Sequence, residues 1–148
     1  MIQGRLVNQS DPPSKNSFDD HGVQKPSLQK ILQLRDWPWV EIVQNYAQNT
    51  GALIKLLLEL DKNSTHITLS ANLGGLVVAG TGIGTVSDEF AQALKIAQQR
   101  GILIWQSSKC AFAVVKSKED ASFYDFHGLS PVKARIALAM HLIACSAA

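Results

Sequence analysis

A short apolar run followed by alternating glycines constrains the fold of this chain more than any other feature. Residues 76–79 read Leu-Val-Val-Ala, and glycines follow at positions 80, 82 and 84. A short run rich in β-branched residues is typical of a strand buried on both faces of a parallel sheet. Residues 86–100 then have the spacing of an amphipathic helix. The sequence therefore predicts a strand, a glycine-rich turn and a helix in succession.

The glycine-rich turn stands where open parallel sheets bind ligands, at the carboxyl end of a strand. Glycines also let a ligand approach the main chain closely. The turn lacks the dinucleotide spacing G-x-G-x-x-G, because Thr85 stands three residues after Gly82, and no Gly-Lys-Ser/Thr of a phosphate loop follows. These residues alone leave two interpretations of about equal weight, a binding turn and a tight connection without a ligand.

Further apolar runs predict strands that alternate with helices. The predicted strands are residues 40–44 and 102–105, and residues 51–59 predict a core helix. We expect a wide apolar face on that helix, formed by Leu53, Ile54, Leu56, Leu57, Leu58 and Leu60. Alternating strands and helices require right-handed crossovers and a parallel sheet covered on both sides. The expected fold class is α/β, a small three-layer sandwich with three or four parallel strands.

Capping signals mark the ends of the two later helices. Ser87 is a predicted N-cap followed by two acidic residues, and Gly101 is a predicted helix end. For the last helix, Ser130 is the predicted N-cap and Pro131 the first helical residue. We expect Arg135 to be solvated, and the apolar face to contain Ile136, Leu138, Met140, Leu142 and Ile143.

The remaining segments are polar. We expect residues 1–38 to be poorly ordered or extended, like a connection between domains, and residues 39–148 to form the α/β domain. Residues 61–74 include a polar insertion that predicts a surface loop or short hairpin. Residues 112–115 predict a short strand, and residues 116–122 a charged, mobile loop.

Charge and targeting signals narrow the classes of function. The chain has 14 Lys and Arg residues against 12 Asp and Glu residues, a net charge of +2, with no basic cluster. Nucleic-acid binding therefore has little support. No apolar stretch approaches the length of a membrane span, and the first residues lack the apolar run of a signal peptide. We expect a cytoplasmic protein that does not contact a membrane.

Cysteines and histidines give no metal or disulfide pattern. Cys110 and Cys145 are expected to be reduced thiols, and Cys110 to be a buried structural thiol rather than a nucleophile. The four histidines are scattered, so we expect no metal and no cofactor. His141 lies in an apolar helical stretch and is expected to be packed or partly exposed.

Three motifs together resemble the carboxyl-terminal domain of bacterial L-asparaginases. They are Ala-Gly-Thr-Gly-Ile-Gly at 79–84, Trp-Gln-Ser-Ser-Lys-Cys at 105–110 and Leu-Ser-Pro-Val-Lys-Ala-Arg at 129–135. In that family a strand ends in G-T-G-N-G, a later strand ends in Ser-Ser/Ala-Ser-Arg, and a helix begins Leu-Asn/Ser-Pro-x-Lys-Ala-Arg. The resemblance covers about residues 40–144 and implies the fold of the smaller part of a complete family member.

The resemblance implies hydrolysis of L-asparagine to L-aspartate and ammonia by a complete family member. There a threonine of a Thr-Gly-Gly-Thr-Ile motif in the amino-terminal domain attacks the amide carbon, and nearby donors stabilise the oxyanion. Neither Thr-Gly-Gly-Thr nor His-Gly-Thr-Asp occurs in this sequence. We therefore expect no catalytic residue in the chain and no activity of the chain alone.

The resemblance also implies substrate contacts in the glycine-rich turn, at Gly82, Ile83, Gly84 and Thr85. In the family this turn reaches the neighbour's active site across a dimer. Ile83 stands where the family has asparagine, and an apolar side chain cannot hydrogen-bond an amino acid, whereas Thr85 keeps a hydroxyl. The implied partners are a second copy, an asparaginase amino-terminal domain or full-length subunit, and a small amino-acid ligand.

Three interpretations of function remain open from the sequence. The chain is a carboxyl-terminal domain separated from its catalytic domain by truncation or gene decay, and we give this the most weight. Alternatively it is a binding or regulatory module that docks on a full-length asparaginase or holds a ligand at residues 80–85, or it is one half of a split enzyme. Apolar surface left without a partner domain predicts oligomers or poor solubility.

Overall fold

A computed structural model describes most of the region in which the sequence predicts structure. The described residues are 23, 25–62, 72–80, 86–110, 124–125 and 129–146, with only the backbone described at 124–125. The elements are α1 (Leu28–Gln33), β1 (Trp39–Gln44), α2 (Ala52–Lys62), β2 (Leu73–Gly80), α3 (Asp88–Gln99), β3 (Leu103–Ser108), β4 (Tyr124–Asp125) and α4 (Pro131–Cys145).

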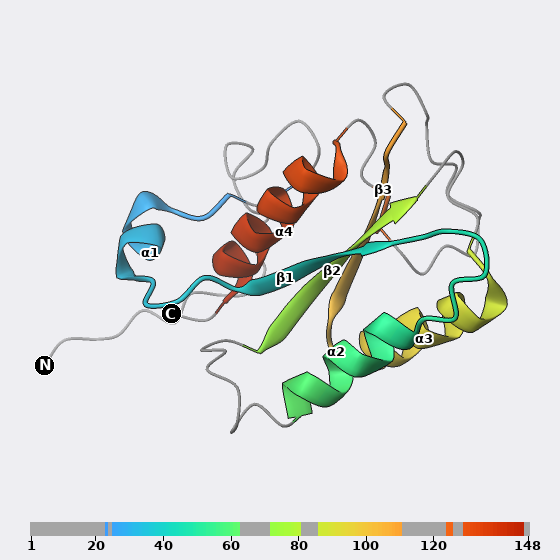
Figure 1. The fold of residues 1–148 in the computed structure, drawn as a ribbon. Helices are drawn as coiled ribbons and strands as arrows, with labels where there is room; N and C mark the ends of the chain where they lie inside the picture. The colour runs from blue at the N-terminus through green and yellow to red at the C-terminus, as the bar shows by residue number, and fades with distance from the viewer. Residues whose placement is uncertain are drawn as a thin grey trace, which may run out of the picture.

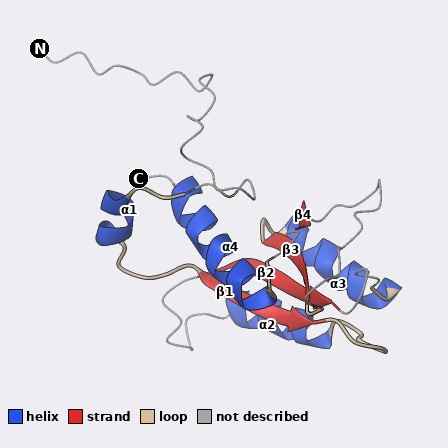
Figure 2. Cartoon of the chain, turned by 90° about the horizontal axis from the view of Figure 1, so that it is seen from above, coloured by secondary structure: helices blue, strands red, loops and turns tan. Residues whose placement is uncertain are grey.

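The described strands form one parallel sheet with the order β1-β2-β3-β4. Helices α2 and α3 cover one face of this sheet, and α4 crosses the other face with α1 beside it (Figures 1 and 2). Successive crossovers of one hand between neighbouring strands place their helices on the same face, as α2 and α3 are. The predicted α/β three-layer sandwich is confirmed, with four strands.

Strand β2 is the centre of the sheet and is almost wholly buried. Leu76 and Val78 belong to the apolar cluster under α2 and α3. Val77, between them, belongs to the cluster under α4, together with Trp105 and Leu138. Successive side chains of a strand point to opposite faces, so a run apolar at every position fits a strand covered on both sides. The predicted buried strand is confirmed and begins earlier than expected, at Leu73.

Part of the segment at residues 61–74, which was predicted to include a polar insertion, lies in a helix or a strand. Asp61 and Lys62 complete α2, and Leu73 and Gly74 begin β2. The Asp61 carboxylate accepts a hydrogen bond of 2.8 Å from the backbone N–H of Leu73, which joins the two ends of the connection. Residues 63–71 lie outside the described part of the chain. The loop is therefore shorter than residues 61–74.

Helix α2 has a narrower buried face than predicted. Ile54 and Leu58 are buried, and they are separated by one helical turn. Leu53 and Leu56 are 53% and 56% exposed, so the prediction that they belong to a wide core face is wrong. The side of the helix that packs on the core consists of Ile54 and Leu58, with Leu57 partly buried beside them.

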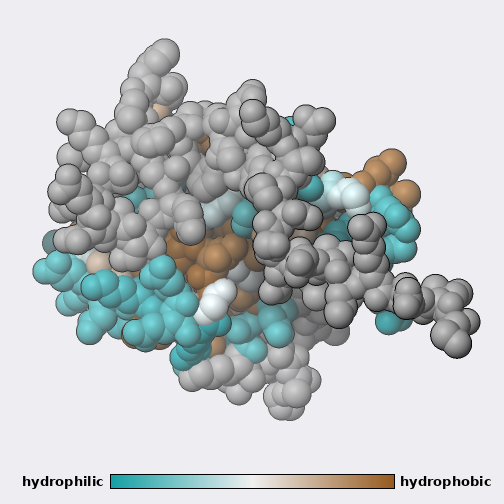
Figure 3. Space-filling view, turned by 180° about the vertical axis from the view of Figure 1, so that it is seen from behind, coloured by the Kyte–Doolittle hydropathy of each residue, from teal (hydrophilic) through white to brown (hydrophobic). Residues whose placement is uncertain are grey.

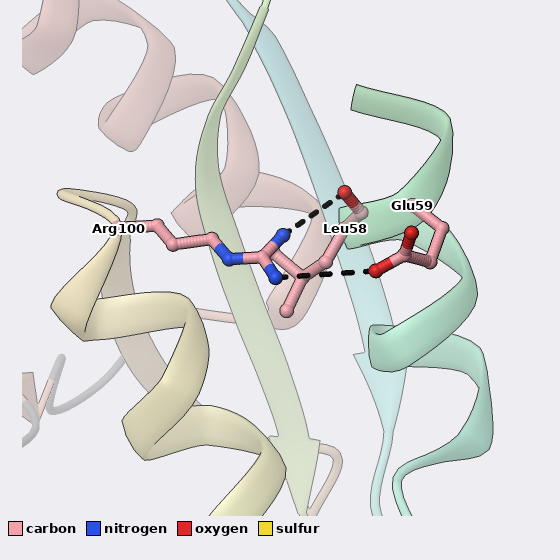
Figure 4. Close-up of polar contacts among 3 residues, drawn as sticks. All are labelled: Leu58, Glu59 and Arg100. Carbon is pink, nitrogen blue, oxygen red and sulfur yellow. Dashed lines mark hydrogen bonds and ion pairs between the residues drawn. The ribbon is translucent and has the colours of Figure 1, made fainter. Parts of the chain in front are cut away.

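Helix α3 begins and ends as predicted. The Ser87 hydroxyl accepts a hydrogen bond from the backbone N–H of Phe90, and Gly101 follows the helix with φ of +84°. Arg100, at the C-cap, donates to the carbonyl of Leu58 at 3.0 Å and lies 4.0 Å from the Glu59 carboxylate (Figure 4). This ion pair is solvent-exposed and contributes little, but the carbonyl bond ties the end of α3 to α2.

Helix α4 begins at Pro131 after an extended Ser130, as predicted, although the Ser130 side chain makes no capping hydrogen bond. Its buried residues are Ala134, Leu138, Ala139 and Ile143. Ile136 is 59% exposed, so its predicted place in the apolar face is wrong. The expectation for Arg135 was incomplete, because Arg135 is exposed yet its Nε donates to the carbonyl of Val40 in β1 at 2.7 Å.

Two short elements were not predicted. Helix α1 lies within residues 1–38, and β4 adds two residues beside Trp105 and Gln106 of β3. The expectations for residues 1–22, 112–115 and 116–122 concern parts of the chain that the structure does not describe. The division at residue 38 stays a prediction. Within the described residues, no helix is long and apolar enough to cross a membrane.

Gly51 is the position where a single methyl group should destabilise the fold most clearly. Its φ is +71°, and a Cβ there would lie 2.5 Å from the Cβ of Ala93. We expect Gly51→Ala to lower the free energy of unfolding by about 2–4 kcal/mol, from backbone strain and overpacking together. Gly101→Ala is the matched control, because its φ is +84° but no atom lies within 4 Å of the added Cβ.

The control should cost only the backbone strain, about 1–2 kcal/mol. Urea unfolding followed by circular dichroism measures both variants. Equal losses for the two variants would contradict the expected clash between the Cβ added at position 51 and Ala93 of α3.

Candidate functional site

The carboxyl ends of β1, β2 and β3 meet at one edge of the sheet. In the sheet register Gln44 is level with Ala79, and Gly80 is level with Ser108. The predicted contacts Gly82, Ile83, Gly84 and Thr85 follow Gly80 in the chain and lie outside the described residues. The structure therefore shows the rim from which the glycine-rich turn departs, and it brings polar residues of three segments to that rim.

Lys109 bridges this edge from β3 to β1. Its backbone N–H donates to the carbonyl of Gly80 at 2.9 Å, and its Nζ donates to the side-chain oxygen of Gln44 at 3.1 Å. Gln44 is a neutral amide, so this bond does not neutralise the ammonium charge. Lys109 is exposed. An exposed ammonium at the end of β2 can exchange its amide partner for a carboxylate, which would form the stronger, charge-assisted hydrogen bond.

Asn49 fixes the backbone around the same edge. Its side-chain amide donates to the carbonyl of Gln44 at 2.7 Å and accepts from the backbone N–H of Gly51 at 2.9 Å. Its own carbonyl accepts from the Ser87 hydroxyl at 2.7 Å. Asn49 is 8% exposed. One buried residue thus joins the end of β1, the start of α2 and the N-cap of α3.

Asn45 continues the sheet beyond β1. Its backbone N–H donates to the carbonyl of Ala79 at 3.0 Å, and the residue is buried. Neither Asn45 nor Asn49 was predicted to be a site residue. Their signal was available, because Asn45 directly follows the predicted strand at residues 40–44 and Asn49 lies five residues beyond its end, where ligands bind in parallel sheets.

Ser107 and Ser108 lie beyond the predicted strand at residues 102–105, but they are the last residues of β3. Ser107 is buried, and its hydroxyl donates to the carbonyl of Leu129, which fixes the start of α4 against β3. The Ser108 hydroxyl accepts from the backbone N–H of Cys110 at 3.1 Å. Cys110 is exposed, so the prediction of a buried thiol is wrong.

The described rim is suited to recognition rather than to acid–base chemistry. It offers amides, hydroxyls and one ammonium. Residues 44–49, 79–80, 86–87 and 106–110 include no histidine, aspartate or glutamate. The hydroxyls of Ser87 and Ser107 each donate to a backbone carbonyl, and no general base stands beside either of them in these ranges. An activated hydroxyl nucleophile needs such a base.

A parallel α/β domain with polar residues gathered at the carboxyl edge belongs to the class of domains that bind ligands at this edge. The Glutaminase/Asparaginase C-terminal domain family matches residues 40–146. The chain therefore belongs to this family, and the resemblance to the carboxyl-terminal domain of L-asparaginases is confirmed.

Individual relatives agree with the family. A crystal structure titled as a probable cytoplasmic L-asparaginase from Campylobacter jejuni superposes with a TM-score of 0.63 and 26% sequence identity, covering 76% of this chain and 34% of that one. A glutamyl-tRNA(Gln) amidotransferase subunit from Metallosphaera sedula is 29% identical over 121 residues, covering 77% of this chain and 27% of the relative. The chain thus spans about a third or less of these relatives.

Asn49 gives a direct test of how the rim is held. We expect Asn49→Ala to lower the free energy of unfolding by about 2–3 kcal/mol, because it leaves the partly buried carbonyl of Gln44 and the buried N–H of Gly51 without this partner. Ser87→Ala is the comparison, and loss of this N-cap should cost about 1 kcal/mol. Chemical denaturation of both variants measures the difference. A smaller loss for Asn49→Ala than for Ser87→Ala would contradict the central place given to Asn49.

Proposed function

We propose that this chain supplies the carboxyl-terminal domain of an asparaginase-type amidohydrolase and does not hydrolyse amides alone. The observation that carries the proposal is the family match over residues 40–146, which is to the C-terminal domain. Amide hydrolysis by this family requires an activated threonine and an oxyanion site. The threonine motifs implied by the resemblance do not occur in the sequence, so the nucleophile would come from another domain or chain.

The proposed contribution of this chain is recognition of an amino-acid substrate at the sheet edge. Gly82, Ile83, Gly84 and Thr85 are the proposed contacts, through backbone groups and the Thr85 hydroxyl. Lys109 supports this placement, because its backbone bonds to Gly80, where the turn begins, and its ammonium lies at the same edge. An amino-acid substrate carries a carboxylate, and an ammonium is a suitable partner for it.

L-asparagine is the proposed substrate of the assembled enzyme, and the cytoplasm its proposed location. The Campylobacter jejuni relative, titled as a cytoplasmic L-asparaginase, supports both. A second candidate is a binding or regulatory module that docks on a full-length subunit, or one half of a split enzyme. The Metallosphaera sedula relative favours this candidate, because its name describes one subunit of an amidotransferase.

Ammonia release tests the first proposal. The folded, purified chain should release no ammonia from L-asparagine or L-glutamine above the buffer rate. A complete L-asparaginase under the same conditions is the positive control, and circular dichroism confirms that the chain is folded. Turnover by the chain alone would overturn the proposal, and Thr81→Ala and Thr85→Ala would then identify the nucleophile.

Exposed apolar side chains support the proposal that the chain binds a partner or a second copy of itself. Leu28 and Leu32 are 70% and 77% exposed on α1, and Val132 and Ile136 are 63% and 59% exposed on α4. Seen from behind, the molecule shows apolar atoms near the middle of the view and towards its right-hand edge (Figure 3). Exposed apolar surface is a common mark of an interaction site.

We expect the isolated chain to form oligomers, measured by size-exclusion chromatography with light scattering. Val132→Ser with Ile136→Ser should shift the distribution towards the monomer. The matched control is Leu53→Ser with Leu56→Ser, on the opposite face of the sheet. A monomer at every concentration would contradict the expectation, as would an equal effect of both pairs.

A further inference from the structure

The carboxyl-terminal end of α4 holds a cluster of titratable side chains far from the candidate site in the fold. Helix α4 starts beside Ser107 at the carboxyl edge and runs back across the sheet, so that Leu142 packs near Gly74 at the start of β2. Beyond Leu142, Cys145 is exposed, and its Sγ lies 3.6 Å from Nε2 of His141, one helical turn earlier.

His141 is held in a state that can accept the thiol proton. Its ring packs against Trp105, with 5.8 Å between the ring centroids. Burial lowers the pKa of His141 below its ordinary value of 6.5. The imidazole is therefore neutral at neutral pH, and in the tautomer with the proton on Nδ1, its Nε2 can take a proton from Cys145.

The helix end itself opposes a thiolate, and Lys30 offsets this effect. The last carbonyls of a helix carry partial negative charge, which disfavours a nearby anion. Lys30 of α1 donates from Nζ to the carbonyls of Ala144 at 2.9 Å and Ser146 at 2.6 Å, and it approaches that of Ile143 at 3.5 Å. Its ammonium thus contacts the residues on both sides of Cys145 in the chain, and cations beside a cysteine favour the thiolate.

We propose that Cys145 is the reactive thiol of this chain and a site of thiol–disulfide exchange, with His141 as its general base. In the proposed step, His141 takes the thiol proton and the Cys145 sulfur attacks one sulfur of a low-molecular-weight disulfide. The bond between the two sulfurs of that disulfide breaks as the mixed disulfide forms. One thiolate leaves with the electron pair, so the reagent is reduced and Cys145 is oxidised.

Cys110 provides an internal comparison. It is also exposed, but it lies just after β3, and its described hydrogen bond is from its backbone to Ser108. His141 is the only one of the four histidines that lies in the described part of the chain. Both thiols are exposed but their surroundings differ. A comparison of their reaction rates therefore separates the effect of exposure from the effect of neighbouring groups on the thiol.

The test uses full-length variants that keep one thiol each, Cys110→Ser and Cys145→Ser. Each is mixed with excess aromatic disulfide that releases a coloured thiolate, and with glutathione disulfide followed by mass spectrometry. At neutral pH we expect the chain that retains Cys145 to react about tenfold faster than the chain that retains Cys110. Equal rates, or faster reaction of Cys110, would overturn the proposal.

His141→Gln in the Cys110→Ser background should bring the rate down to that of Cys110. Tryptophan fluorescence and circular dichroism report whether this variant still folds. Lys30→Met in the same background is the second variant, and it should also slow the reaction while leaving His141 in place. If the folded variants react as fast as their parent, the assigned roles are wrong.

The pH dependence gives a readout that exposure alone would not produce. His141 accepts a proton only when neutral, and burial lowers its pKa, so the base form persists below pH 6.5. The rate ratio of Cys145 to Cys110 should hold down to pH 6.5 and fall as the pH passes through the lowered pKa of His141. Lys30 faces the same helix end from α1. A ratio independent of pH would contradict base catalysis.

Discussion

Burial of β2 on both faces is the constraint on which the rest of the structure depends. Its backbone pairs with β1 on one side and β3 on the other, and its side chains join both apolar clusters. Removing every polar group of a strand from water is tolerable only when neighbours pair all its backbone groups. Helix α4 lies so close to β2 that a Cβ on Gly75 would meet Leu138 at 2.6 Å, so the strand needs glycine there.

The same burial determines where chemistry can occur. A strand covered on both faces meets solvent only at its ends, and the glycine-rich turn leaves β2 at its carboxyl end. Asn49 and Lys109 satisfy backbone groups around that exit, one from each neighbouring strand's end. The described part of the rim therefore has a fixed frame and an exposed ammonium, that of Lys109. The hydroxyls of Ser87 and Ser107 belong to this frame, because each donates to a backbone carbonyl.

The sequence predicted the sheet well because its signals are local. The uniform apolar run of β2, the Ser87 cap and the Pro131 start each depend on a few neighbouring residues, and each was confirmed. The errors concern contacts made at long range. Leu56 and Ile136 are apolar yet exposed, because tertiary packing decides which face of a helix is buried. The Arg135 side chain donates a hydrogen bond to the carbonyl of Val40, which is distant in the sequence. The exposure of Cys110 and the hydrogen bonds of Asn49 likewise depend on the tertiary structure, which the spacing of residues in the sequence does not determine.

Helix α4 connects the two chemically distinct ends of the domain. Its start is held by Ser107 at the carboxyl edge of the sheet, and its end by Lys30 of α1 at the opposite edge. Family membership accounts for the first end, because the sequence motifs that resemble the family lie there and the fold agrees with them. The match also extends over His141 and Cys145 at the second end, whereas Lys30 of α1 lies before the matched residues 40–146. Cys145 and the candidate substrate edge lie at opposite ends of α4, so a substitution of Cys145 leaves the contacts that hold the start of the helix in place.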